Sequence, residues 1–164
     1  MPVAKLTDAE INDLIALPKY LPSDYRRRLK AKVRGFSAKH EEAKLEVPVD
    51  NTGTFRVIIR KNLVNLQDFS IILGYISQDK SGLIRLKRHN GIHEHTNKIE
   101  GITFREFHIH RATQRYQETG FDIDAYAEPT DKYSNADEAL ETFLDDCNFI
   151  RPDSDKNQTK MPLF

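Results

Sequence analysis

The fold is decided by residues 43–61, which read AKLEVPVDNTGTFRVIIRK. Apolar and polar residues alternate through 43–49 and again through 54–61, and this period of two is typical of β-strands with one buried face. Asn51-Thr52-Gly53 separates the two stretches, as the turn of a β-hairpin would. The sequence therefore predicts an antiparallel hairpin at this point.

Three later stretches are equally rich in Val, Ile, Leu and aromatic residues and extend the predicted sheet: residues 68–77, 82–89 and 102–111. Short connections at 62–67 and 79–82 join successive strands, so we expect an antiparallel meander. The connection from Asn90 to Gly101 is longer, and loops of that length inside a compact domain are often functional.

Two helices are predicted ahead of the sheet. Thr7 and Glu10 form a capping box for the first helix, which Pro18 ends. The second helix begins at Ser23 or Asp24. Its apolar stripe consists of Tyr25, Leu29, Val33 and Phe36.

A last helix is predicted from about Ser134 to Phe149. Its buried face consists of Ala136, Ala139, Leu140, Phe143, Leu144 and Cys147. The sum is an α+β fold with two N-terminal helices, an antiparallel sheet of about five strands in meander order, and one C-terminal helix. We expect one domain over residues 1–150 and a flexible tail over residues 151–164.

The composition excludes several classes of protein. The chain has 164 residues and a mass of 19.0 kDa, enough for one domain with its own core. No apolar run approaches the ~20 residues of a membrane span, and we expect no signal peptide at the start of the chain. We therefore expect a cytoplasmic protein with no membrane partner. Cys147 is the only cysteine, which excludes an internal disulfide and a cysteine-based zinc site.

The net charge of the chain is zero, but two segments carry charge of opposite sign. Residues 25–39 are basic and contain no acid, whereas residues 122–146 are strongly acidic. Such asymmetry is typical either of a basic zone that attracts polyanions or of two solvated helix faces.

Alternation also assigns the side chains of each predicted strand to two faces. One face is apolar and should form the core beneath the helices. The other face is rich in basic residues and carries Arg56, Arg60, Arg85, Lys87, His89, Glu106, His108 and His110. Because Ser, Thr and Glu would serve equally well on a solvated face, this excess of Arg, Lys and His indicates a function.

The basic face favours RNA cleavage by metal-free acid–base chemistry. Histidine can act as an acid or a base near neutral pH, and an adjacent cation offsets the charge that develops on a phosphate. The catalytic candidates are His93, His95, His108, His110 and Arg85. The candidates for binding RNA phosphates are Arg56, Arg60, Lys87, His89 and Arg111. This reaction needs no cofactor, and RNA would be the partner.

A metal site is the alternative function of the same histidines. His93-x-His95 and His108-x-His110 each place two imidazoles on one side of an extended segment. Four such ligands, or three with Glu100, suit zinc, iron or manganese. The first pair followed by Glu100 is also faintly similar to the cupin ligand pattern. A purely structural role, with each pair hydrogen-bonded locally, is the third alternative.

The predicted hairpin keeps the two histidine pairs apart. If residues 82–89 and 102–111 form a plain hairpin, His89 lies near Ile102 and His108 lies roughly 20 Å away. The intervening loop would have to fold back over the sheet for its histidines to meet His108.

Several motifs in order resemble an uncharacterised bacterial family known only as a domain of unknown function. They are Leu17-Pro18-Lys19, Phe55-x-Val57-x-Ile59-Arg60, Ile84-Arg85-Leu86, Gly91-x-His93-x-His95-Thr96-Asn97, Gly101, Phe107-His108-Ile109-His110-Arg111-Ala112, Ala127-x-Pro129-Thr130 and Phe143-Leu144-x-x-Cys147-Asn148. The resemblance extends to about Ile150. The chain is also distantly similar to the TumE group of toxin–antitoxin proteins, whose toxins resemble small RelE-type ribonucleases. This resemblance implies helices before an antiparallel sheet, a ribonuclease-like toxin acting through its basic sheet face, and a cognate antitoxin as partner.

A non-catalytic binding module is the second class of function. The basic second helix, with Arg26, Arg27 and Arg28, and the acidic last helix would then be the partner surfaces of a phage or defence-system protein. RNA-binding proteins usually place aromatic residues among the basic ones, and the basic face of this helix has none.

Overall fold

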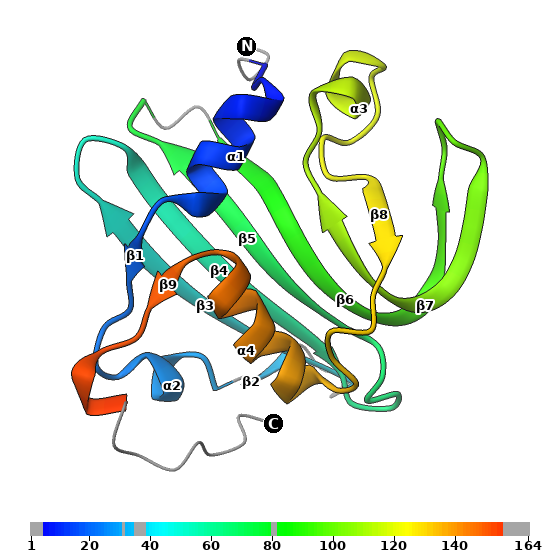
Figure 1. Cartoon of the computed structure of the whole chain (residues 1–164). Coiled ribbons are helices and arrows are strands. Elements are labelled where there is room, and N and C mark those ends of the chain that lie inside the picture. Colours follow the sequence, from blue (N-terminus) through cyan, green and yellow to red (C-terminus); the bar gives the residue numbers. More distant parts are fainter. Residues whose placement is uncertain (1–4, 31, 35–38, 80–81, 156–164) are drawn as a thin grey trace.

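The computed structural model describes residues 5–30, 32–34, 39–79 and 82–155 (Figure 1). Its main element is an antiparallel sheet with the strand order β2-β3-β4-β5-β6-β7-β8. These strands are β2 (Lys32–Arg34), β3 (His40–Val49), β4 (Gly53–Asn62), β5 (Phe69–Ser77), β6 (Leu83–Asn97), β7 (Ile102–Arg111) and β8 (Tyr126–Pro129). Strands that are adjacent in the sheet follow one another in the chain, so the predicted meander is confirmed.

The hairpin of residues 43–61 forms as predicted. β3 and β4 pair outward from Val49 and Gly53. Gly53 has a φ of 148°, and a Cβ at this position would lie 2.3 Å from the carbonyl oxygen of Ile76 in β5. Glycine is therefore required here both by the backbone conformation and by the close approach of the neighbouring strand.

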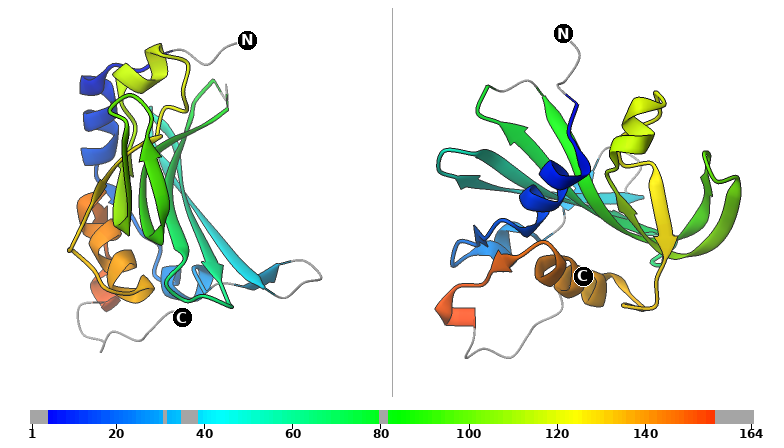
Figure 2. Two further views of the ribbon diagram at one scale, coloured as in Figure 1. Left: turned by 90° about the vertical axis from the view of Figure 1, so that its right-hand side faces the viewer. Right: turned by 45° about the horizontal axis from the view of Figure 1, so that its top comes forward.

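Helices cover one face of the sheet. In Figure 2, α1 (Asp8–Ala16) and α4 (Ala136–Asp146) lie on the same side of it. The predicted capping box of Thr7 and Glu10 is present. The predicted apolar face of the last helix is buried in full, with Ala136, Ala139, Leu140, Phe143, Leu144 and Cys147 in the core. The protein thus has the predicted α+β class, with its core between the sheet and these helices.

The second predicted helix is mostly wrong. α2 covers only Tyr25–Arg28, and β2 instead pairs as an edge strand with His40–Glu42 of β3. Val33 of the predicted apolar stripe lies in this strand, and Phe36 lies outside the described residues. A short helix gains few hydrogen bonds, so pairing with a sheet edge overrides the local helical pattern.

Several short elements have no recognisable period in the sequence. β1 (Lys19–Tyr20) pairs in parallel with β9 (Phe149–Ile150), α3 (Gln114–Glu118) follows β7, and η1 (Asp153–Asp155) follows β9. Lys19 is fully buried. Its ammonium group donates to three backbone carbonyls, those of Ile15, Leu17 and Cys147.

The first residues of the predicted tail, 151–155, are bonded to the rest of the domain. Arg151 pairs with Glu141 at 2.6 Å, and Asp155 accepts a 2.9 Å hydrogen bond from Arg26 Nε. Arg26 also pairs with Glu141 at 3.1 Å, so the basic second helix and the acidic last helix are in part each other's partners. The rest of the predicted tail lies outside the described residues.

A register shift changes the faces of β6. Arg85 pairs with Gly74 and Lys87 with Leu73, so Leu86 has no partner across the strands. Lys87 consequently shares the helix-covered face with the core residue Leu73, and His89 does the same. The prediction that Lys87 and His89 share a face with Arg85 is wrong, because strict alternation does not allow for a bulge.

Candidate metal centre

β6 and β7 bend together into a U, and β8 runs between its arms (Figure 1). The bend contains a second register shift, in which Gly91 and Ile92 have no partner in β7. The carbonyl oxygen of Gln67 accepts the Ile92 N–H at 2.7 Å, and a Cβ on Gly91 would lie 1.9 Å from that oxygen. Only glycine leaves room for this contact. β6 therefore continues to Asn97, and the prediction of a long loop after His89 is wrong.

The longer strands bring the two histidine pairs together. His89 pairs with Ile109, not with Ile102 as the plain hairpin predicted. The ring centroids of His93 and His108 are 4.6 Å apart, and so are those of His95 and His110. The predicted separation of the pairs is wrong because it assumed that pairing started at His89.

Three of these histidines form one cluster in the described chain. His95, His108 and His110 each offer a ring nitrogen, and these three nitrogens lie within 4.8 Å of one another. His108 and His110 are buried and His95 is partly buried. We call this group the histidine triad.

The positions of the protons follow from the hydrogen bonds. His108 Nδ1 lies 2.7 Å from the carbonyl oxygen of Glu106, and His110 Nδ1 lies 2.8 Å from that of Asp124. A carbonyl oxygen can only accept, so each Nδ1 carries the proton and donates it. Each Nε2 keeps its lone pair, and both are buried with no hydrogen-bond partner. Such buried polar atoms are rare and indicate a missing ligand or a function.

The proton of His95 is fixed by Asn97. Asn97 Nδ2 donates to the carbonyl of Ala127 at 2.7 Å, and Oδ1 accepts the Ala127 N–H at 2.9 Å. These two bonds identify the oxygen end of the amide. His95 Nε2 lies 2.8 Å from that oxygen and therefore donates to it. The lone pair of His95 is then on Nδ1.

Burial keeps His108 and His110 uncharged. Desolvation lowers the pKa of His108 to about 4 and that of His110 to about 2, and the nearby positive charge of Arg88 acts in the same direction. Neutral imidazole is the form that binds a metal ion. A general acid, by contrast, has to be protonated near the working pH.

The triad fits a first-row transition-metal ion in three respects. Histidines that bind metals usually donate their second ring N–H to a carbonyl, carboxylate or water, which orients the ring, and comparable bonds to backbone carbonyls or an amide oxygen hold all three rings here. Tetrahedral zinc with bonds of 2.0–2.1 Å places its nitrogen ligands about 3.3 Å apart, a spacing within the 4.8 Å limit that holds for one nitrogen of each triad ring. Three protein ligands also leave a coordination position open.

An arginine lies beside the triad. Arg88 is opposite His110 across the strands, and its Nη2 is 3.2 Å from His110 Nδ1. That nitrogen already donates to the backbone of Asp124, so the contact with Arg88 is electrostatic. The fully buried carboxylate of Asp124 holds Arg88 Nε at 2.9 Å and Arg85 Nη2 at 3.2 Å. Neither Arg88 nor Asp124 was a sequence-based candidate: the bulge at Leu86 puts Arg88 on the face opposite to the one that strict alternation assigns it, and Asp124 lies outside any strand.

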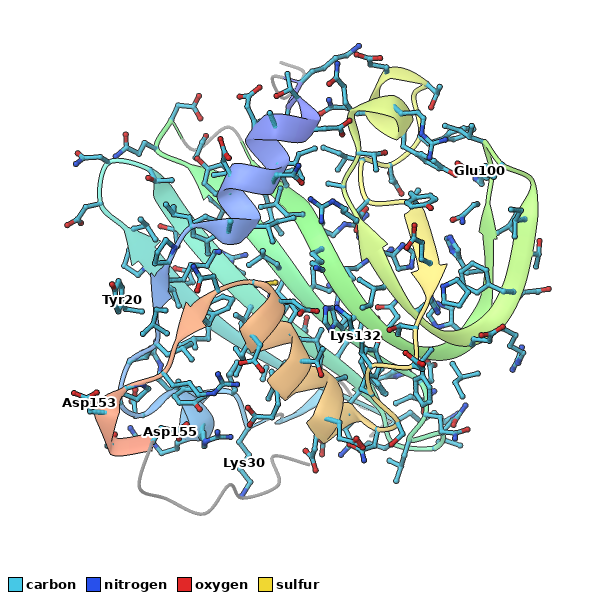
Figure 3. All side chains as sticks on the ribbon, in the orientation of Figure 1. Tyr20, Lys30, Glu100, Lys132, Asp153 and Asp155 are labelled. Atoms are coloured by element: carbon cyan, nitrogen blue, oxygen red, sulfur yellow. The ribbon has the colours of Figure 1, made fainter. Side chains whose placement is uncertain are left out.

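Two candidates from the sequence do not join the triad. His93 contacts the His108 ring, and its Nδ1 is 3.6 Å from a carboxylate oxygen of Asp68. Glu100, at the tip of the U (labelled in Figure 3), is bonded to Arg115 and Tyr116. The cupin-like set with Glu100 as a ligand is therefore wrong.

The predicted phosphate-binding residues do not form one surface. Arg56 and Arg60 pair with Glu46 and Glu42 on the sheet face away from the helices. His89 lies in the core, stacked on Tyr133 and edge-on to Phe143, where burial lowers its pKa to about 3.

Lys87 and Arg111 are opposite each other on the helix-covered face, whereas His108 and His110 point to the other face. The predicted grouping of Lys87 with the histidines is wrong because of the bulge at Leu86. Arg111 is on the other face by simple alternation with His110 along β7.

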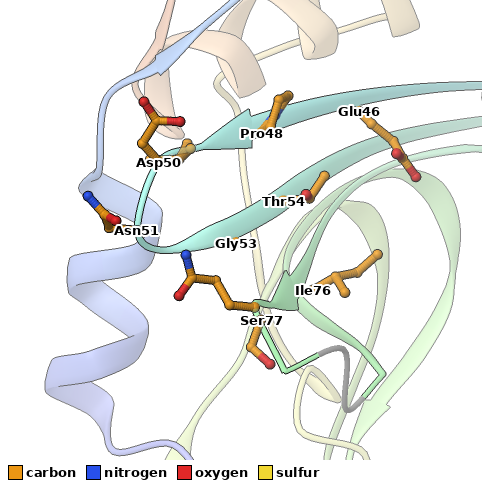
Figure 4. Close-up of a pocket in the computed structure, with 10 residues that line it drawn as sticks. Glu46, Pro48, Asp50, Asn51, Gly53, Thr54, Ile76 and Ser77 are labelled. Carbon is orange, nitrogen blue, oxygen red and sulfur yellow. The ribbon is translucent and has the colours of Figure 1, made fainter.

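A hollow in the surface lies away from the triad, at the ends of β3, β4 and β5 (Figure 4). Its volume is about 710 Å³. Its lining includes Glu46, Asp50 and Asn51 but no histidine, arginine or lysine. This hollow is therefore separate from the histidine triad and contains none of its residues.

Fold and site together define an α+β protein with a largely buried histidine triad inside a curled sheet. The chain belongs to a family of unknown function, DUF6978, whose model matches residues 6–150. No curated protein and no solved structure matches the chain. The likeness to the TumE and RelE toxins stays a prediction. Within the described residues, no helix has the length and apolar character needed to cross a membrane.

Proposed function

We propose that the protein binds one divalent transition-metal ion through His95, His108 and His110 and uses the open coordination position for catalysis. The observation that supports this is the state of the ring nitrogens. In each ring one nitrogen donates to a fixed acceptor, which leaves the lone pair on the other nitrogen, and for His108 and His110 that nitrogen is buried without a hydrogen-bond partner. Three protein ligands with one open position are typical of catalytic rather than structural zinc sites.

The donor set favours zinc or ferrous iron. Imidazole suits both ions, whereas a calcium or magnesium site would need oxygen ligands. The bound ion would act as a Lewis acid or lower the pKa of a bound water. Arg88, held by Asp124, would place a positive charge beside the same position and favour an anionic substrate.

Metal content and affinity test this proposal directly. The full chain, purified without a histidine tag, should contain close to one equivalent of zinc or iron by elemental analysis. After chelation, cobalt titration should restore one equivalent and give the visible absorption of a low-symmetry site.

Variants assign the ligands. His95→Ala, His108→Ala and His110→Ala should each weaken zinc binding more than about 100-fold, beyond the loss typical of outer-shell changes. The matched control is His40→Ala, because His40 is an exposed histidine of β3. A folded, untagged protein that binds none of the three metals, or triad variants that bind as well as His40→Ala, would contradict the proposal.

Metal-free RNA cleavage remains the competing prediction. It needs one histidine to be protonated near neutral pH, and the lowered pKa values of His108 and His110 disfavour that. Incubation with mixed RNA separates the two: cleavage that persists in EDTA and is lost in His108→Ala would support the ribonuclease-like function.

A further inference from the structure

A second basic site lies on the opposite face of the same two strands. Side chains alternate along β7. His108 and His110 therefore lie on the triad face of the sheet, and Ile109 and Arg111 lie on the other face. There the structure has a groove of about 310 Å³. Its lining consists of Lys87, Ile109, Arg111, Tyr126, Glu128, Pro129, Thr130 and Lys132.

The two central cations of this groove repel each other. Lys87 and Arg111 are directly opposite across β6 and β7, and like charges in this position are destabilising. Other cations of the sheet have acidic partners, such as Arg56 with Glu46. Within the described part of the chain, no carboxylate forms an ion pair with Lys87 or Arg111.

The rest of the groove provides a third cation and partly apolar walls. Lys132 (labelled in Figure 3) lines the groove, although its ammonium also pairs with Asp146 at 3.2 Å. Glu128 is the one carboxylate in the lining, and it accepts a 2.7 Å hydrogen bond from the hydroxyl of Tyr126. Ile109 and Pro129 add apolar surface.

We propose that this groove binds the phosphate group of a small phosphate ester, with Lys87 and Arg111 as its main ligands. A phosphate offers up to two negative charges and several acceptor oxygens, so it can bridge two opposed cations and relieve their repulsion. The arginine fork can bind two oxygens while the lysine acts as a point charge. The apolar walls would contact the group that the phosphate esterifies. This inference does not depend on a metal in the triad.

Phenyl phosphate is the probe of choice, with inorganic phosphate and benzoate as comparisons. Calorimetry on the full chain should show saturable binding of phenyl phosphate, weaker binding of inorganic phosphate and the weakest binding of benzoate. Lys87→Gln and Arg111→Gln should each weaken phenyl phosphate binding at least about tenfold, as for loss of one charged hydrogen bond. Lys44→Gln and Arg105→Gln are matched controls, because both residues are exposed on β3 and β7.

Melting temperatures of the variants, measured without and with phenyl phosphate, separate a loss of binding from a loss of folding. Without ligand, Lys87→Gln should melt at the same temperature as the unaltered protein or higher, since it removes a repulsion. With phenyl phosphate, only the unaltered protein and the two controls should gain stability.

Two results would overturn the inference. One is equal phenyl phosphate affinity in Lys87→Gln, Arg111→Gln and the controls. The other is tight binding of a short single-stranded RNA together with no detectable binding of phenyl phosphate, which would make the groove part of an RNA surface.

Discussion

Asn97 binds Ala127 as a paired strand residue would, but through its side chain. Its amide donates to the Ala127 carbonyl at 2.7 Å and accepts the Ala127 N–H at 2.9 Å. The same oxygen accepts the ring N–H of His95. One side chain therefore joins the tip of the β6–β7 hairpin to β8 and orients a member of the triad.

Asn97→Ala should weaken both the fold and the metal site. It leaves the buried backbone groups of Ala127 without partners, so we expect the free energy of unfolding in urea to fall by about 2–3 kcal/mol. Zinc affinity should fall about 10–100-fold because His95 loses its orienting acceptor. Thr96→Ala is the control, since the exposed Thr96 hydroxyl is bonded to Thr103 on the hairpin surface. Equal effects of the two changes would contradict the role given to Asn97.

Gly91→Ala should disturb the bend of the U. The added methyl group would meet the backbone of Gln67, which cannot rotate away as a side chain could. We expect a loss of about 1–3 kcal/mol in the free energy of unfolding, the usual cost of overpacking. The His95 and His108 ring signals should also shift in NMR spectra. Unchanged stability and unchanged ring signals would show that the bend does not depend on this contact.

Asp124→Asn should destabilise the protein through Arg88. The change removes the charge that compensates the guanidinium, and breaking a buried pair from one side costs about 3–5 kcal/mol. Because Arg88 retains some exposure, we expect the lower end of that range. Arg88→Met combined with Asp124→Asn should lose less stability than the sum of the two single changes, as measured by a double-mutant cycle in urea. Additive losses would show that the two side chains do not depend on each other.

Acid should unfold the metal-free protein at a pH set by its buried histidines. Burial lowers the folded-state pKa of His89, His108 and His110 to about 3, 4 and 2. In the unfolded chain their pKa is about 6.5, so below that pH the unfolded state binds more protons and is favoured. The stability is complete above pH 6.5 and falls as the pH drops toward the folded-state values.

The slope of this loss is about 1.4 kcal/mol per pH unit for each histidine, or about 4 kcal/mol per unit for the three together near pH 5. Urea unfolding measured from pH 7 to pH 5 checks this value. His89→Leu should reduce the slope by about one third, whereas the exposed control His40→Ala should leave it unchanged. A stability that is flat from pH 7 to pH 5 would contradict the burial of these imidazoles.

The sequence determined the features that depend on local pattern. Four such features follow from periodicity or cap chemistry, and all are present in the structure. They are the hairpin of residues 43–61, the meander, the capping box at Thr7 and the buried face of the last helix. The identity of the triad was only partly determined. Its three histidines were among the candidates, but the sequence also grouped them with Lys87 and His89, which point to the other face of the sheet.

Tertiary structure decided the rest, because the deciding contacts are long-range. The unpaired Leu86 reverses the faces of β6, and the contact of Gly91 with Gln67 bends the strand so that it continues to Asn97. Neither an unpaired residue nor a distant backbone contact changes the alternation of apolar and polar residues along the chain. The sequence by itself therefore supplied the histidines, whereas the bulges and the bend decided which of them meet.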